Sequence, residues 1–111
     1  MSEQKPLIRR FVRVGNLIFL SGMTGGPGDV ATQIRNTFEK IKTTLESAGS
    51  SMANVVKATV YLTDLRNREL YFNNLWREYF PDDPPARTCV EAGLAPGTHV
   101  EIETIATVPK T

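Results

Sequence analysis

The chain has 111 residues, 41% of them hydrophobic and 23% charged, which is typical of a single globular domain. Its net charge of +1 argues against a nucleic-acid or membrane surface, and no apolar run approaches the roughly 18 residues of a membrane span. Cys89 is the only cysteine, which excludes an internal disulfide and, with no apolar signal segment near the N-terminus, leads us to expect a cytoplasmic protein. With a single histidine as well, we expect no metal site.

The first half of the chain predicts a hairpin followed by a helix. After a loose tail at residues 1–6, strands at Ile8–Val14 and Leu17–Ser21 flank the turn signal Gly15-Asn16. The second strand is apolar throughout, so we expect it to be buried on both faces. Asp29 is a suitable N-cap for a helix that ends near Gly49. The apolar stripe of this helix has helical spacing: Ile34, Phe38, Ile41, Leu45 and Ala48.

The second half predicts a strand, a helix and two more strands. The strand Val55–Leu62 would bury alternate residues, namely Val56, Ala58, Val60 and Leu62. Asp64 to Asn67 would cap the second helix, which Pro81 ends. Its aromatic stripe indicates core packing rather than ligand binding: Phe72, Leu75, Trp76, Tyr79 and Phe80. The last strand runs from about His99 to Val108.

This order, ββαβαββ, predicts an α+β fold, a two-layer sandwich in which two helices cover one face of a mixed sheet. The other face of the sheet would remain uncovered. An open face on buried strands suggests self-association, and closed symmetric oligomers are the usual result.

The stretch 85–105 carries the residues best suited to chemistry. Alternate residues share a face of a strand, so one strand would present Arg87, Cys89 and Glu91, and the next His99, Glu101 and Glu103. If these two strands pair, an arginine, a thiol and acidic groups come within reach of one another. A guanidinium can hold a carboxylate with two parallel hydrogen bonds, and a glutamate can move a proton. The pattern predicts a site for a small carboxylic acid.

The segments Pro85-Ala-Arg-Thr-Cys-Val-Glu91 and Val100-Glu-Ile-Glu-Thr-Ile-Ala106 resemble the reactive intermediate deaminase family, also called Rid or YjgF/YER057c/UK114. The likeness continues through 15–22 and 54–64 and covers roughly residues 12–108, so that 1–111 would form one Rid-like domain. It implies a chorismate-mutase-like fold and a homotrimer around a central barrel, with active sites between subunits.

The resemblance also implies roles for individual residues. Arg87 looks like the arginine that clamps the substrate carboxylate, and Glu101 like the glutamate that handles the attacking water and the departing amine. Four further positions match substrate-binding positions of the family: Ser21, Gly22, Asn73 and Cys89, the last mainly through its backbone N–H. The implied reaction converts 2-aminoacrylate or 2-aminocrotonate, through the imine, into a 2-oxo acid and ammonia. It requires neither a metal nor an organic cofactor.

One segment departs from the family. Active members commonly carry Gly-Pro-Tyr before the first hairpin, whereas this chain has Pro6-Leu-Ile-Arg-Arg-Phe11. Two interpretations of Arg9 and Arg10 are open. They form either a solvated basic edge or a second positive group that favours a larger, doubly acidic substrate such as an aminomuconate-like enamine.

Other functions remain open beside the deaminase. Some members of the family are non-catalytic small-molecule-binding or chaperone-like trimers, and ribonuclease activity is ascribed to others. The near-neutral charge counts against the ribonuclease, because phosphate backbones demand a basic stripe. From the pattern alone, Arg87 could equally form a structural ion pair, and Cys89 could be a small buried apolar side chain.

Overall fold

The computed structural model of the chain describes residues 4–109. Of the tail predicted at residues 1–6, the first three residues lie outside this range, and residues 4–6 are exposed and belong to no helix or strand.

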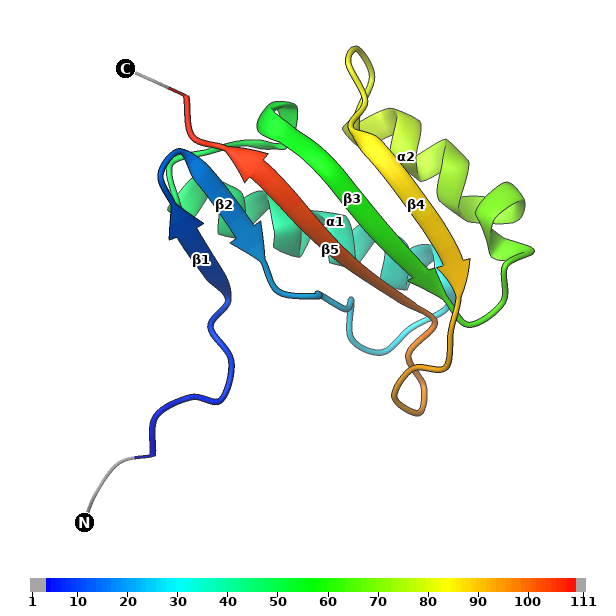
Figure 1. Cartoon of the computed structure of the whole chain (residues 1–111). Helices are drawn as coiled ribbons and strands as arrows, with labels where there is room; N and C mark the ends of the chain where they lie inside the picture. Colours follow the sequence, from blue (N-terminus) through cyan, green and yellow to red (C-terminus); the bar gives the residue numbers. More distant parts are fainter. Residues whose placement is uncertain (1–3, 110–111) are drawn as a thin grey trace.

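The centre of the fold is one five-stranded mixed sheet with the strand order β1-β2-β5-β3-β4 (Figure 1). Its strands are β1 (Phe11–Val14), β2 (Leu17–Leu20), β3 (Val55–Leu62), β4 (Ala86–Glu91) and β5 (Val100–Thr107). β3 and β4 are parallel and are connected through helical residues, whereas all other neighbours are antiparallel. β1 and β4 therefore form the two edges of the sheet.

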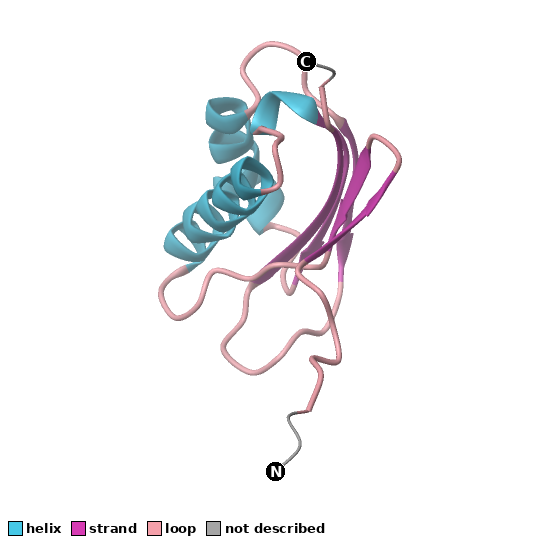
Figure 2. Cartoon of the chain, turned by 90° about the vertical axis from the view of Figure 1, so that its left-hand side faces the viewer, coloured by secondary structure: helices cyan, strands magenta, loops and turns pink. Residues whose placement is uncertain are grey.

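Both helices, α1 (Val30–Ser47) and α2 (Asn73–Tyr79), lie on the same face of the sheet, and the other face carries no helix (Figure 2). The predicted element order and the α+β class are confirmed. α1 begins where the sequence indicates, because the Asp29 carboxylate accepts a hydrogen bond of 2.8 Å from the backbone N–H of Thr32. This hydrogen bond lowers the pKa of Asp29.

The core lies between α1 and the sheet and is closed at one end by aromatic rings. Four residues of the predicted stripe lie in α1 and are buried, and Phe38, at 1% exposure, is the largest of them. The fifth, Ala48, follows the last residue of the helix and is half-buried. Four rings surround Phe38 at centroid distances of 4.7–6.3 Å: Phe72, Trp76, Tyr79 and Phe80. The expectation that the aromatic stripe of the second helix packs in the core is therefore confirmed.

Three details of the predicted strands are wrong. The first strand begins at Phe11 rather than Ile8, whose side chain is 73% exposed. β2 is not buried on both faces, because Phe19 points to the uncovered face and is 39% exposed. Val56 does not belong to the buried face of β3. A register shift between Val55 and Lys57 turns Val55 inward and leaves Val56 45% exposed.

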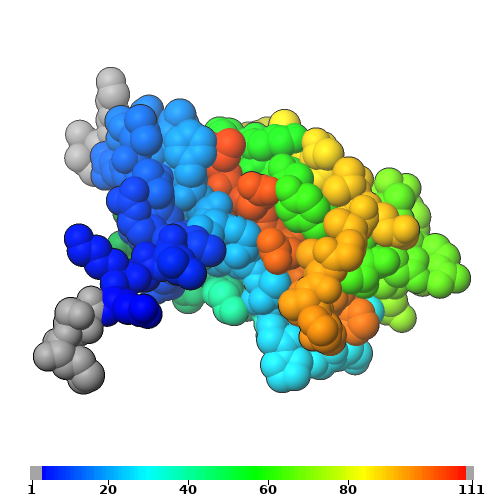
Figure 3. All heavy atoms as spheres, turned by 60° about the horizontal axis from the view of Figure 1, so that its bottom comes forward, coloured from blue at the N-terminus to red at the C-terminus, as the bar shows by residue number. Residues whose placement is uncertain are grey.

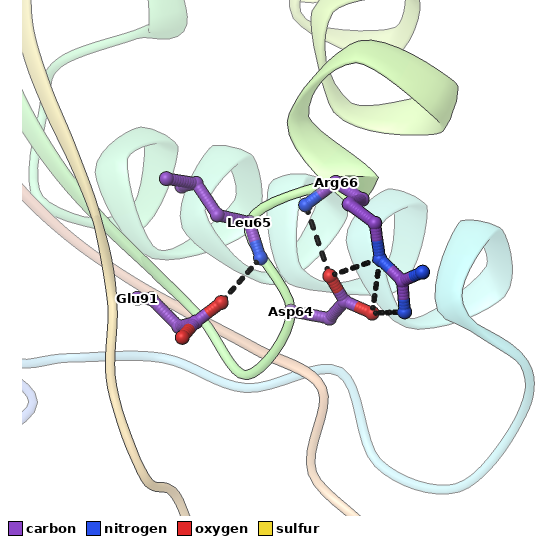
Figure 4. A network of polar contacts seen from close by, with 4 residues as sticks. All are labelled: Asp64, Leu65, Arg66 and Glu91. Carbon is purple, nitrogen blue, oxygen red and sulfur yellow. Dashed lines mark hydrogen bonds and ion pairs between the residues drawn. The ribbon is translucent and has the colours of Figure 1, made fainter.

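The second helix begins differently from the prediction. The Asp64 carboxylate accepts from the backbone N–H and the guanidinium of Arg66, so it closes a turn instead of capping the helix (Figure 4). These hydrogen bonds lower the pKa of Asp64. A π-helical turn, Arg68–Phe72, then precedes α2, and the backbone N–H of Asn73 donates to the carbonyl of Arg68. Nothing in the local sequence pattern indicates this irregular turn.

Across residues 4–109, no helix is both long and apolar enough to cross a membrane.

Candidate functional site

Arg87 lies on the edge strand β4 and points toward the helices. It pairs in register with Ala58 of β3, which is fully buried on the helix-covered face. Its Nη1 donates a 2.9 Å hydrogen bond to Oδ1 of Asn73, and its guanidinium carbon lies 5.0 Å from the ring centroid of Trp76 and 5.6 Å from that of Phe72. The aromatic rings attract the cation through their negative faces. Arg87 is thus fixed without an ion pair to any carboxylate among the described residues.

A cavity of about 540 Å³ opens beside this guanidinium, between α2 and β4. The residues that line it are Asn73, Trp76, Arg77, Phe80, Pro81, Asp82, Pro84 and Arg87. Because Arg87 keeps donor groups that Asn73 does not occupy, it can accept a small carboxylate at this cavity.

Cys89 lies two residues further along β4, on the same face as Arg87, and is half-buried. Burial raises the pKa of its thiol, although the positive charges of Arg87 and Arg68 act in the opposite direction. The thiol is therefore neutral at neutral pH and a weak nucleophile. This agrees with a role in lining the site rather than in covalent catalysis.

Glu91, the third residue of the predicted set on β4, is bound elsewhere. Its Oε1 accepts a 3.0 Å hydrogen bond from the backbone N–H of Leu65, in the loop that follows β3 (Figure 4). It holds this loop against the end of β4 and is not directed at Arg87.

Ser21, Gly22 and Glu101 form a second group at the end of β2. Ser21 continues the hairpin, since its backbone N–H donates to the carbonyl of Arg10 and its Oγ to that of Arg9. Gly22 faces Glu101 so closely that a Cβ placed on it would collide with the Glu101 carboxylate and lie 3.1 Å from its Cδ. Glycine at this position lets the carboxylate lie directly against the backbone.

Glu101 and Glu103 share the uncovered face of β5 but have different surroundings. Glu103 accepts a short hydrogen bond from the hydroxyl of Tyr61, and this bond raises the tyrosine pKa. Glu101 makes no hydrogen bond to another described side chain. Of the two carboxylates, Glu101 is therefore the one that remains available to a ligand.

The structure divides the predicted site residues between two places. Asn73, Arg87 and Cys89 lie together at the β4 edge, whereas Ser21, Gly22 and Glu101 lie together at the end of β2. The strands of Arg87 and Glu101 do not pair, because β3 lies between them, so the condition on which the predicted juxtaposition depended is not met. Their side chains also point to opposite faces, since Glu101 precedes the fully buried Ile102, which faces the helices.

Sequence reasoning missed two contributions to these groups. Helical spacing predicts only core packing for Phe72 and Trp76, yet both rings also support the guanidinium of Arg87. Lys40, an exposed residue of α1, lies beside Arg9 and Arg10 at a second cavity. The contact of the two rings with Arg87 depends on how β4 lies beside the helices, which the local sequence does not indicate. The helical spacing of α1 likewise gives no indication that Lys40 lies at a cavity. Among residues 4–109, no three His, Cys, Asp or Glu side chains gather as they would around a metal ion.

Comparison with known proteins identifies the class to which this fold and these residues belong. Residues 4–108 match the family described as Endoribonuclease L-PSP. A RutC family protein of Pyrococcus abyssi is 41% identical over 104 aligned positions, which cover 86% of this chain and 81% of that protein. A RutC family protein of Pyrococcus horikoshii is 39% identical, with 86% and 82% covered.

Solved structures agree with the sequence comparison. A YjgF family member from Neisseria meningitidis superimposes with a TM-score of 0.90 at 34% identity, covering 97% of this chain and 92% of that one. RidA from an Antarctic Psychrobacter gives 0.88 at 32% identity, covering 96% and 92%. The chain therefore belongs to the YjgF/YER057c/UK114 family, which includes the Rid and RutC proteins.

Proposed function

We propose that this protein is a deaminase that hydrolyses reactive 2-enamine and 2-imino acids, of the 2-aminoacrylate or 2-aminocrotonate type, to 2-oxo acids and ammonia. The observation that carries the proposal is Arg87, which is fixed by Asn73 and two aromatic rings, has no acidic partner among the described residues and faces a cavity. A buried or half-buried arginine with unused donors is suited to hold a substrate carboxylate.

The reaction needs a carboxylate clamp and one proton-transfer group. The enamine first takes up a proton at carbon and becomes the 2-imino acid. Water then adds to the imine carbon and gives a carbinolamine, from which ammonia departs as the carbonyl forms. Glu101 would accept a proton from the attacking water and return one to the departing nitrogen. Arg87 would hold the carboxylate so that the imine carbon faces this water.

The two residue groups lie apart in one chain, so the proposal includes a second copy that completes each site. The β4 edge with Arg87 would meet the Ser21–Glu101 group of a neighbour, as in the homotrimer expected for the family. The uncovered sheet face supports association, because apolar side chains on it, Phe19 among them, are exposed in a single copy and would be buried against a neighbour. We also retain the cytoplasmic location as a prediction.

The test measures ammonia and 2-oxo acid release from an enamine generated in situ, after subtraction of the background without the protein. We expect the wild type to accelerate release. Arg87→Ala and Glu101→Ala should each lower the rate at least about 100-fold, since each removes a group that acts in the transition state. Glu103→Gln is the matched control for Glu101, because it alters the neighbouring carboxylate on the same strand face.

Folding and association of each variant are checked by circular dichroism and light scattering. A wild type that adds nothing to the background rate would overturn the deaminase and favour the non-catalytic binding protein. Full activity in a folded Arg87→Ala variant would show that Arg87 does not bind the substrate carboxylate.

A further inference from the structure

A second cavity, of about 450 Å³, lies where the N-terminal segment passes the loop that follows β2. Its walls are the residues from Ser21 to Thr24 on one side and Arg9, Arg10 and Lys40 on the other. Figure 3 views the molecule from this end and shows the N-terminal segment beside the loop after β2. The cavity thus joins three cationic side chains to a wall that already belongs to the candidate site.

None of the residues that line this cavity is acidic. The Nη2 of Arg10 donates to the hydroxyl of Thr44 at 3.0 Å, and the Nζ of Lys40 donates to the carbonyl of Thr24 at 2.7 Å. Both partners are neutral, and no ion pair within residues 4–109 involves Arg9, Arg10 or Lys40. Three like charges held at one cavity repel one another, and a bound anion relieves that repulsion.

Gly22 connects this cavity to the proposed chemistry. The same glycine lines the cavity and contacts the Glu101 carboxylate. Glu101 itself does not line the cavity, so the Gly22 backbone is the part that the cavity and the Glu101 carboxylate share. A substrate presented to Glu101 reaches the cations if its side chain extends past Gly22, and the basic cavity is in this sense adjacent to the reacting site.

We propose that Arg9, Arg10 and Lys40 bind a second acidic group on the substrate, so that the preferred substrate is a 2-imino dicarboxylic acid. This inference rests on the proposed deaminase function. In it, the carboxylate next to the imine binds Arg87 of a neighbouring copy, and the side-chain carboxylate binds the three cations. Two clamps of the same charge at opposite ends of the substrate would fix its direction in the site.

The chemistry at the imine carbon is unchanged by the second carboxylate. For 2-iminoglutarate, the water oxygen forms the new bond to carbon, the C–N bond breaks, and the nitrogen leaves as ammonia after it has taken up both protons of the water. The product is 2-oxoglutarate. No electron transfer or co-reactant is needed.

The test compares 2-iminoglutarate with 2-iminobutanoate, each generated in place by an amino-acid oxidase from the corresponding amino acid. Spontaneous hydrolysis is subtracted for both. We expect kcat/KM for the dicarboxylic imine to exceed that for the monocarboxylic imine by about tenfold or more. This is the change in affinity that one hydrogen bond to a charged group typically produces. Higher ionic strength should reduce this preference, since the cations are exposed to solvent.

Arg9→Gln is the most direct variant, because no described hydrogen bond involves the Arg9 side chain and only its backbone carbonyl holds Ser21. It should lower the ratio of the two kcat/KM values about tenfold. Lys40→Gln should lower the ratio similarly, and Lys40→Arg, which keeps the charge, should restore it. Lys42→Gln on the same helix is the matched control, since Lys42 does not line the cavity and its loss should leave the ratio unchanged.

Binding of the two products separates this inference from the deaminase itself. We expect 2-oxoglutarate to bind more tightly than 2-oxobutanoate in calorimetry, and Arg9→Gln to remove the difference. If neither imine is hydrolysed but this binding difference is found, the catalytic proposal fails and the dicarboxylate site stands. If the monocarboxylic imine is hydrolysed equally well or better and Arg9→Gln changes nothing, the dicarboxylate site is wrong and the deaminase stands.

Discussion

Arg87 and Glu101 project from opposite faces of one sheet, with strand β3 between the strands that carry them. No rotation of either side chain brings them together across the buried layer of Ala58, Val60 and Ile102. If both serve one reaction, they must come from different copies of the chain.

Mixing two inactive variants tests this arrangement directly. Arg87→Ala keeps Glu101, and Glu101→Ala keeps Arg87. In a ring of randomly mixed copies, about a quarter of the sites receive one intact residue from each neighbour, whatever the ring size. We therefore expect about a quarter of the wild-type rate after the two variants are unfolded together and refolded, measured as ammonia release. A mixture no more active than its components would show that the two residues do not share a site between copies.

Asn73 is expected to act by positioning Arg87. Its Oδ1 occupies one guanidinium nitrogen at 2.9 Å and leaves the others for substrate. Asn73→Ala frees the guanidinium to move and should lower kcat/KM about tenfold, mainly through KM, because a hydrogen bond to a charged group is lost.

Asn73→Asp separates positioning from simple loss of a contact. The new carboxylate would form an ion pair with Arg87 and compete with the substrate for it, so this variant should be less active than Asn73→Ala. If the aspartate variant matched the wild type in KM, the guanidinium could not be the group that binds the substrate carboxylate.

Gly22→Ala probes the contact with Glu101. A Cβ at this position would displace the Glu101 carboxylate, and a shift of about 1 Å in a catalytic group can lower the rate about 100-fold. Because Gly22 is exposed, the melting temperature should change little. Gly93→Ala is the control, since a Cβ there would meet no atom within 4 Å. Equal turnover in both variants would mean that the position of Glu101 is unimportant.

Cys89 should behave as a half-buried, neutral thiol. Burial raises its pKa, so the thiolate is scarce at neutral pH, and alkylation by iodoacetamide should accelerate only at a pH above the ordinary thiol value. The unfolded chain should react with a lower midpoint. Arg87→Ala should move the folded midpoint further upward, because Arg87 favours the thiolate. A midpoint below that of the unfolded chain would instead identify a reactive cysteine.

The sequence predicted where each helix and strand lies in the chain better than it predicted which strands are adjacent in the sheet. Helical spacing placed α1 to within a residue or two, because one apolar stripe and one capping residue define such a helix. Alternation within strands says nothing about which strands are adjacent, so the position of β3 between β4 and β5 could not be read from 85–105. The parallel β3–β4 pair connected by α2 is a long-range feature of the chain.

The site shows the same limit. Residue types and the family resemblance indicate six candidate positions, but they do not indicate that three lie at the β4 edge and three at the end of β2. The support of Arg87 by Phe72 and Trp76 depends on residues more than ten positions away in the chain, and periodicity accounts for those rings by core packing alone. Burial of Phe19 was expected because an apolar run does not reveal whether both faces of its strand are covered within one copy.

The π-helical turn at Arg68–Phe72 fixes the length of the segment between two anchors. One anchor is the Leu65 backbone, held by Glu91 at the end of β4, and the other is Asn73, held against Arg87. Deleting one residue from the turn would restore α-helical winding and rotate the preceding residues by about 100° relative to α2. A change of a single residue in the length of this segment would therefore separate the two anchors, whereas a substitution at the exposed Leu70 would leave their spacing unchanged.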